Sequence, residues 1–329
     1  DEIARDIGRP ADPRRDAADP VDVTRLSRDV GFRLSMQWPH QDVGAVDVAV
    51  AEAAAEAESL KSDAFTAAVL SRLGLETSAY DVTEDVMRDG IADAAPSGPP
   101  PPPVIEMGPY VPLRHWRAPT RDELRHCPLV IATPRNSFRI QWLRGLFSDC
   151  RVRVIHLTRN PAASVNGLLD GWQDDGFFTT PMSEGLRIDG YSDVHPWGDR
   201  WWKFDVPPLW RHFVRAPLAA VAAEQWRAAH LAIVEDAGSD DLRVRYEDVV
   251  GSPEQRASAG RAMAQFLSID ENETVAAVVA GTRPVMATAP PARRRWSGSG
   301  HDLAPALAEP AVWEMAVELG YDVDERLWI

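Results

Sequence analysis

The chain has 329 residues, 45% of them hydrophobic, and a formal net charge of −15. This length and apolar content suffice to bury a sizeable core, either as one large α/β domain or as a domain with a helical cap. The negative charge argues against sequence-independent binding of nucleic acid, which needs a basic surface. It remains compatible with an anionic cofactor, because a local cluster of arginines is enough to bind one.

The composition also bears on location and partners. No apolar run approaches the roughly 20 residues of a membrane span, and the chain does not open with a signal-peptide pattern. We therefore expect a cytoplasmic protein with a small-molecule substrate and neither a membrane nor a nucleic-acid partner, and a homo-oligomer stays open. Cys127 and Cys150 are expected to be ordinary small core residues in a reducing compartment. Lysine is almost absent, since only Lys61 and Lys203 occur.

The part of the chain before residue 128 carries few functional signals. Apolar spacing over 43–74 predicts a helix or a pair of helices, and 75–95 reads as a weaker helix. The prolines within 96–103 predict a stiff exposed linker, for which a spacer is favoured over a ligand of proline-recognising modules. We interpret 1–127 as a divergent, mostly helical N-terminal part.

The chain is organised around residues 128–172, which predict two short buried strands, each followed by a helix. The first strand is Leu129–Ile131, an apolar run that ends at a turn over 133–136. Apolar residues then recur at helical spacing over 140–147. This pattern of strand, helix and strand is typical of α/β proteins.

The second strand is Val152–Leu157, a run rich in β-branched residues that ends at Arg159 and Asn160. Pro161 suits the first turn of a helix, where its missing N–H is not needed, and the helix continues to Trp172. A strand, a turn with an arginine and a helix N-terminus together predict an anion site. Free backbone N–H groups, the positive end of the helix dipole and a guanidinium converge there.

These residues resemble the middle of the bacterial sulfotransferase family, which moves sulfuryl from 3'-phosphoadenosine-5'-phosphosulfate (PAPS) to a hydroxyl. In that family one strand ends in Lys-Thr-Pro-Arg-Asn, and the next ends in Arg-Asp/Asn-Pro at the helix that grips the 3'-phosphate. Here 133–136 and 159–161 match these motifs, and 170–172 matches the end of the helix.

The remainder of the chain follows in a consistent order. Residues 173–212 are rich in aromatic residues and predict a long lid loop, which either lines an acceptor cleft or seals the core. In the family this region borders the acceptor site, and the cleft candidates are Trp172, Phe177, Trp197, Trp201, Trp202 and Trp210. We then expect a helix over 217–236, a strand over 242–246, a helix ending at Phe266–Leu267, a short helix over 273–280 and a terminal helix over 312–319. Glu247–Asp248 follows the strand, where a structural role is favoured over a catalytic one.

The resemblance covers about 128–321. It implies an α/β protein of the P-loop-nucleotide-kinase-like sulfotransferase fold, with a central parallel sheet flanked by helices over 128–329. It also implies an enzyme that moves a sulfuryl group from PAPS to a hydroxyl of a small metabolite, with a secondary metabolite as one option. The expected cofactor-binding residues are Arg135, Arg159, Ser164, Arg293, Arg294 and Arg295.

The sequence departs from the family at three points. No Pro-Arg-Ser-Gly-Thr-Thr loop occurs before residue 128, so the loop would have to precede Asp1 or be too divergent to read. The lysine expected before Thr133 is Ala132, and the serine expected eight residues after Arg159 is Gly167. Loss of one electrostatic donor of this kind can cost about 100- to 1000-fold in rate.

The acceptor hydroxyl needs a base, and the candidates are His40, His115 and His195, each near aromatic or proline residues. The carboxylates of Glu106, Asp170 and Asp174 are weaker candidates. His156 is expected to lie in the core. Arg135 and Arg139 are either structural or replace the charge of the absent lysine.

Two other functions remain open from the sequence. One is an enzyme of the same fold that has lost the use of PAPS and performs other small-molecule chemistry. The other is a non-catalytic binding protein. No motif indicates a metal site, a serine-hydrolase elbow or a dinucleotide fingerprint.

Overall fold

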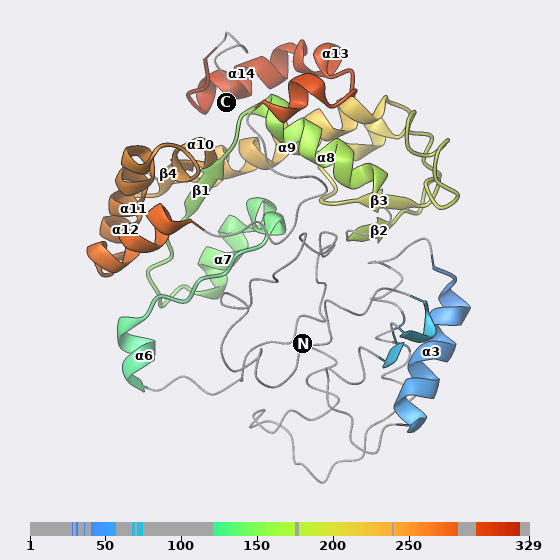
Figure 1. Ribbon diagram of the computed structural model, residues 1–329, viewed down its shortest axis with the longest axis horizontal. Helices are drawn as coiled ribbons and strands as arrows, with labels where there is room; N and C mark the ends of the chain where they lie inside the picture. The colour runs from blue at the N-terminus through green and yellow to red at the C-terminus, as the bar shows by residue number, and fades with distance from the viewer. Residues whose placement is uncertain are drawn as a thin grey trace.

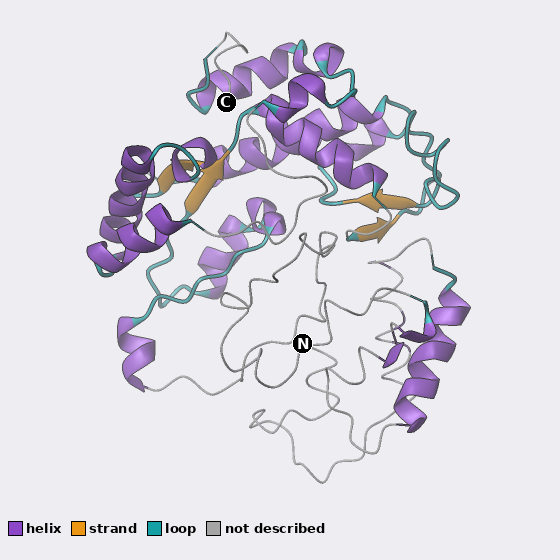
Figure 2. Cartoon of the chain, viewed as in Figure 1, coloured by secondary structure: helices purple, strands orange, loops and turns teal. Residues whose placement is uncertain are grey.

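The computed structural model describes residues 28, 31, 36, 41–56, 68–69, 71–74, 121–174, 178–238, 240–281 and 294–322. The helix predicted over 75–95 and the linker predicted over 96–103 lie outside these residues. Figure 2 shows that helices dominate the described chain, with the strands confined to two short pairs.

Two parallel strands, β1 (Ile155–Thr158) and β4 (Leu242–Arg245), form a small sheet. Ile155 pairs with Leu242, and the register continues to the last residue of each strand, so both strands end at the same edge. Parallel strands need a long crossover connection, and here it contains two helices. The α/β class is therefore confirmed. Both predicted strands occur, but β1 begins at Ile155 rather than Val152 and is only half buried, because Ile155 and Leu157 are exposed.

The two crossover helices are α8 (Pro161–Gln173) and α9 (Leu218–Asp236), which lie beside each other in Figure 1. Both were predicted from apolar spacing. The C-terminal helices α13 (Ala304–Leu307) and α14 (Pro310–Glu318) pack against α9, and α14 confirms the predicted terminal helix. This packing buries one contiguous core between the crossover and the end of the chain.

The core is centred on Trp172, which is fully buried. Its ring meets those of Tyr191 and Trp202 edge-on, with centroids 4.6 and 5.5 Å away. The indole N–H donates to Gln225 Oε1 at 2.9 Å, and Gln225 Nε2 donates to the carbonyl of Lys203 at 2.9 Å. Both ends of the buried amide are therefore satisfied, which offsets the cost of burying it.

The first strand predicted in the central stretch, Leu129–Ile131, is wrong. These residues are not in a strand, and their exposed fractions are 76%, 70% and 46% in chain order. The Asn136 side-chain amide donates to the Ile131 carbonyl at 3.0 Å, so this acceptor is taken by a local turn rather than by a sheet. A 3₁₀ helix, η1 (Pro134–Phe138), follows, and then the predicted helix α7 (Ile140–Leu146).

The lid loop predicted over 173–212 contains more regular structure than expected. Strands β2 (Thr179–Pro181) and β3 (Trp201–Lys203) pair in antiparallel fashion, with Thr179 opposite Lys203. The 3₁₀ helix η2 (Trp210–Phe213) follows. Each strand has only three residues and contains proline or consecutive tryptophans, so neither shows the alternation that would reveal it in the sequence.

Lys203 is fully buried at the end of this hairpin. Its ammonium donates to the carbonyl of Gly171 at 3.1 Å and to the carbonyl of Asp174. These carbonyls belong to the C-terminal end of α8, where a cation complements the negative end of the helix dipole. Lys203 therefore joins the hairpin to α8.

The other elements follow the predicted order. Helix α3 (Val43–Glu56) and the helical residues near Gly74 lie in the region predicted as a helix pair, and Gly74 has a φ of 66° at the predicted stop. Cys127 and Cys150 are both exposed, so the prediction that they are core residues is wrong; each lies in a loop beside α6 or α7. The bounds not yet given are α6 (Arg121–His126), α10 (Tyr246–Val249), α11 (Pro253–Leu267), α12 (Glu271–Ala280) and η3 (Arg295–Gly298).

Candidate functional site

The first part of the candidate site is the turn between β1 and α8. Asn160 is fully buried, and its Oδ1 accepts from the backbone N–H of Ala163 at 2.8 Å, which caps the helix. Pro161 occupies the first helical position, as predicted. The chain thus turns sharply from the strand into the helix, and the preceding Arg159 is left exposed at the edge of the sheet.

Glu247 stabilises this turn from the second position of α10, the short helix that follows β4. Its Oε1 accepts from the backbone N–H and the side-chain amide of Asn160 at 2.9 and 2.8 Å. The Tyr321 hydroxyl lies 3.1 Å from Glu247 Oε2 and 3.1 Å from Thr158 Oγ1, and burial raises the pKa of this hydroxyl above its ordinary value. These contacts give Glu247 the structural role favoured from the sequence.

Arg159 and the first two turns of α8 provide the groups that could bind an anion. The guanidinium carbon of Arg159 lies 4.9 Å from the centroid of the Tyr246 ring, which supports the side chain while leaving it exposed. Ser164 is partly exposed, with its Oγ 3.5 Å from the Arg159 carbonyl. A Cβ added at Gly167 would meet no atom within 4 Å, so this face of α8 is open.

Arg135 does not join this group. Its guanidinium carbon lies 4.0 Å from the centroid of Phe178, its Nη2 donates to Thr180 Oγ1 at 3.2 Å, and its Nε lies 3.3 Å from Asp205 Oδ1. These contacts connect η1 with the β2–β3 hairpin. Of the two roles left open for Arg135, these contacts favour the structural one, while Arg139 is exposed.

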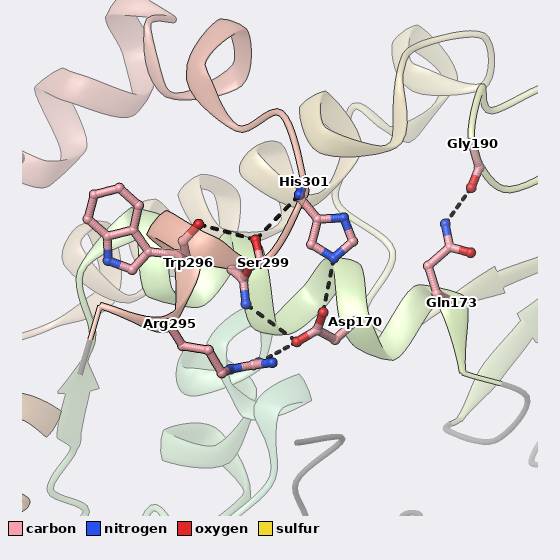
Figure 3. A network of polar contacts seen from close by, with 8 residues as sticks. Asp170, Gln173, Gly190, Arg295, Trp296, Ser299 and His301 are labelled. Carbon is pink, nitrogen blue, oxygen red and sulfur yellow. Dashed lines mark hydrogen bonds and ion pairs between the residues drawn. The ribbon is translucent and has the colours of Figure 1, made fainter. Parts of the chain in front are cut away.

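A second cluster surrounds Asp170 in the later half of α8, and Figure 3 shows it from close by. One carboxylate oxygen, Oδ2, forms an ion pair with Arg295 and accepts from Asn166 Nδ2 at 3.4 Å. The other, Oδ1, lies 3.0 Å from His301 Nε2. Asp170 therefore anchors both ends of the loop 295–301 to α8. Sequence reasoning missed His301, because its partner is 131 residues away in the chain.

Of the remaining predicted cofactor residues, Arg295 lies in this cluster and Arg294 lies next to it. Arg294 is exposed, and its guanidinium carbon lies 5.4 Å from the centroid of the Trp296 ring. Its φ of 51° is in the left-handed region, at the point where η3 begins. Arg293 lies outside the described residues.

The structure describes one of the three predicted catalytic histidines. His195 is partly buried between Tyr191 and Trp197, with ring centroids 5.4 and 4.8 Å away, so it contributes to an aromatic stack. His40 and His115 lie outside the described residues. Of the weaker candidates, Asp170 lies in the cluster described above, Asp174 follows α8, and Glu106 is outside the described residues.

The predicted cleft residues divide into two groups. Trp172 and Trp202 are fully buried in the core, so for these two the sealing of the core replaces the predicted cleft. Trp197, Trp201 and Trp210 are partly exposed, and Phe177 lies outside the described residues. Burial of both side chains is tolerated because their indole N–H groups donate to Gln225 Oε1 and to the Asp205 carbonyl.

A further pair of histidines lies behind β1. His156 is 4% exposed, as expected of a core residue, and its Nε2 lies 2.7 Å from His230 Nδ1 on α9. Burial, aided by the charge of Arg243, lowers the pKa of His156 to about 4. Burial, then His156 and Arg243, lower the pKa of His230 to about 3. Both rings are therefore neutral at pH 7.

Comparison with protein-family models, with curated proteins and with solved structures finds no match for this chain. Among the described helices, none is long and apolar enough to cross a bilayer. Across the same residues, no group of three or more His, Cys, Asp and Glu side chains could hold a metal ion.

Proposed function

We propose that this protein has the sulfotransferase fold and transfers a sulfuryl group from PAPS to a hydroxyl of a small metabolite. The observation that carries the proposal is the exposed Arg159 at the carboxyl end of β1, directly before the capped N-terminus of α8. Ligands in α/β proteins bind outside the carboxyl ends of the strands. The order of motifs over 128–321 adds the expectation that the ligand is PAPS.

In this proposal the 3'-phosphate lies over the first turns of α8. Arg159 contacts it from the helix N-terminus, and Ser164 faces it from the next turn. The open space above Gly167 gives the phosphate room, since a Cβ there would meet no atom within 4 Å. Arg294 and Arg295 approach α8 from the C-terminal loop, because η3 packs on this helix. A guanidinium paired with phosphate oxygens is among the stronger polar contacts in proteins.

The test is a calorimetric titration of 3',5'-adenosine diphosphate, the desulfated product, into the purified chain. We expect micromolar binding in the wild-type protein and a loss of at least about tenfold in Arg159→Ala, because one charge-assisted contact is worth about 1.5–3 kcal/mol. Arg200→Ala is the matched control, since Arg200 is an exposed arginine paired only with its neighbour Asp199 among the described residues. No binding by a folded wild-type protein would contradict the proposal.

Position 167 offers a test by gain of function. Gly167→Ser restores the residue type of the family, and the added atoms enter open space. We expect the serine variant to bind 3',5'-adenosine diphosphate about tenfold more tightly than Gly167→Ala, because only serine supplies a hydroxyl to the phosphate. Both variants should gain stability of up to about 1 kcal/mol, since glycine is unfavourable within a helix. Equal affinities of the two variants would place the phosphate elsewhere.

A second candidate function is binding of the nucleotide without sulfuryl transfer, and the positions of the lysines support it. Ala132 occupies the position before Thr133 at which the family has its lysine. Lys203 cannot replace that charge, because its ammonium is buried against carbonyls at the end of α8. An enzyme that binds the nucleotide without transferring sulfuryl would keep the Arg159 site and lose this charge. Binding of 3',5'-adenosine diphosphate without any consumption of PAPS would favour this second function.

A further inference from the structure

His301 and Asp170 form a dyad whose geometry determines where the proton of the imidazole lies. A carboxylate only accepts hydrogen bonds, so the contact of 3.0 Å places the hydrogen on His301 Nε2. The lone pair of the neutral ring is then on Nδ1, on the side of the ring turned away from Asp170 in Figure 3. Within the described part of the chain, no hydrogen bond reaches Nδ1.

The carboxylate is itself held in place. Arg295 and Asn166 both contact Asp170 Oδ2, the oxygen that does not face the histidine. Asp170 therefore cannot turn away without breaking an ion pair and a hydrogen bond. The side chains of Asp170 and His301 are 15% and 28% exposed, so the dyad is sheltered but reaches solvent. This arrangement fixes the tautomer and the orientation of a basic nitrogen.

The dyad lies between the two regions that the proposed reaction would use. Asp170 follows Gly167 by one helical turn, about 5 Å along the axis of α8. Three residues further along α8, Gln173 Nε2 donates to the Gly190 carbonyl at 2.6 Å. This hydrogen bond joins the end of α8 to the aromatic-rich residues 178–212. Along α8, Asp170 therefore lies between the proposed phosphate face at Gly167 and the contact of Gln173 with Gly190.

We propose that His301 is the general base of the sulfuryl transfer and that Asp170 is its positioning residue. This assignment rests on the function proposed above. The acceptor O–H gives its proton to His301 Nδ1 while the acceptor oxygen forms a bond to sulfur. The bond between sulfur and the 5'-phosphate oxygen breaks, and its electron pair leaves with 3',5'-adenosine diphosphate. Asp170 stabilises the imidazolium until the proton passes to solvent.

The other described histidines are less suited to this role. The ring of His156, which is buried on β1, is hydrogen-bonded to the partly buried ring of His230 on α9. His195 is part of the stack with Tyr191 and Trp197. His301, by contrast, lies 3.0 Å from the Asp170 carboxylate.

The experiment measures sulfuryl transfer from PAPS to two phenols at one pH. Para-nitrophenol is largely ionised near pH 8 and needs no base, whereas para-cresol is protonated and does. We expect His301→Gln to lower the rate with para-cresol by about 100- to 10,000-fold, the usual contribution of general-base catalysis. The rate with para-nitrophenol should change by less than about threefold. Asp170→Asn should show the same selectivity with a smaller loss.

His212→Gln is the matched control, because His212 is an exposed histidine on η2. Equal losses with both phenols in His301→Gln would indicate a structural role and overturn the assignment. Binding of 3',5'-adenosine diphosphate with no wild-type transfer to either phenol would also overturn it. Absence of nucleotide binding would instead defeat the proposed function itself. Thermal unfolding of each variant shows whether the fold is retained.

Discussion

Replacement of Trp172 by alanine is expected to destabilise the protein by about 3–5 kcal/mol, the usual cost of deleting a buried tryptophan. The side chain is fully buried, and its ring meets those of Tyr191 and Trp202 edge-on. The variant also leaves Gln225 Oε1 without its indole donor. Urea unfolding measures the effect as a lower midpoint at unchanged slope.

The control for this prediction is Trp142→Ala on α7. Trp142 is 61% exposed, so its removal should change the free energy of unfolding by about 0.5 kcal/mol or less. A loss in Trp172→Ala as small as in this control would mean that Trp172 does not support the core. It would then reopen the interpretation of Trp172 as a cleft residue.

Acidification from pH 7 to pH 5 is expected to lower the free energy of unfolding by about 2 kcal/mol for each histidine of the buried pair. The folded pKa values of His156 and His230, about 4 and about 3, lie below the ordinary value of 6.5. Between these values the unfolded chain binds more protons than the folded one. Stability is therefore complete above pH 6.5 and is lost as the pH falls toward 4.

The double variant His156→Leu, His230→Phe isolates this effect. It removes both titrating rings, so the difference in unfolding free energy between pH 7 and pH 5 should shrink relative to the wild type. His212→Gln, which alters an exposed histidine, should keep the wild-type difference. Identical pH dependence of the double variant and the wild type would show that carboxylates, rather than this pair, govern acid sensitivity.

Much of the fold could be predicted from local signals in the sequence. The turn at Asn160 and Pro161 identified the start of α8, since an N-cap residue and a first-turn proline have a local physical basis. The strands over 155–158 and 242–245 were visible as β-branched or apolar runs beside a helix. The same turn led to the prediction of an anion site at Arg159.

What could not be predicted depends on contacts between distant residues. Leu129–Ile131 has the composition of a strand, but the exposure of its side chains depends on whether another strand lies beside it. The pairing of His301 with Asp170 and the burial of Lys203 depend on how distant loops pack against α8. The spacing of residues in the sequence does not reveal this packing. The division of the tryptophans between core and surface has the same origin.

The burial of Lys203 also determines which side chains carry positive charge on the described surface. Since Lys203 is the one lysine among the described residues, every cation on their surface is an arginine or a histidine. Guanidinium groups stay charged at any pH a protein tolerates, and acetylation of lysine cannot remove them. Amine-reactive labels and crosslinkers therefore find no lysine target on the described surface. The charge of the arginines there is constant, and any change of surface charge with pH comes from carboxylates and histidines.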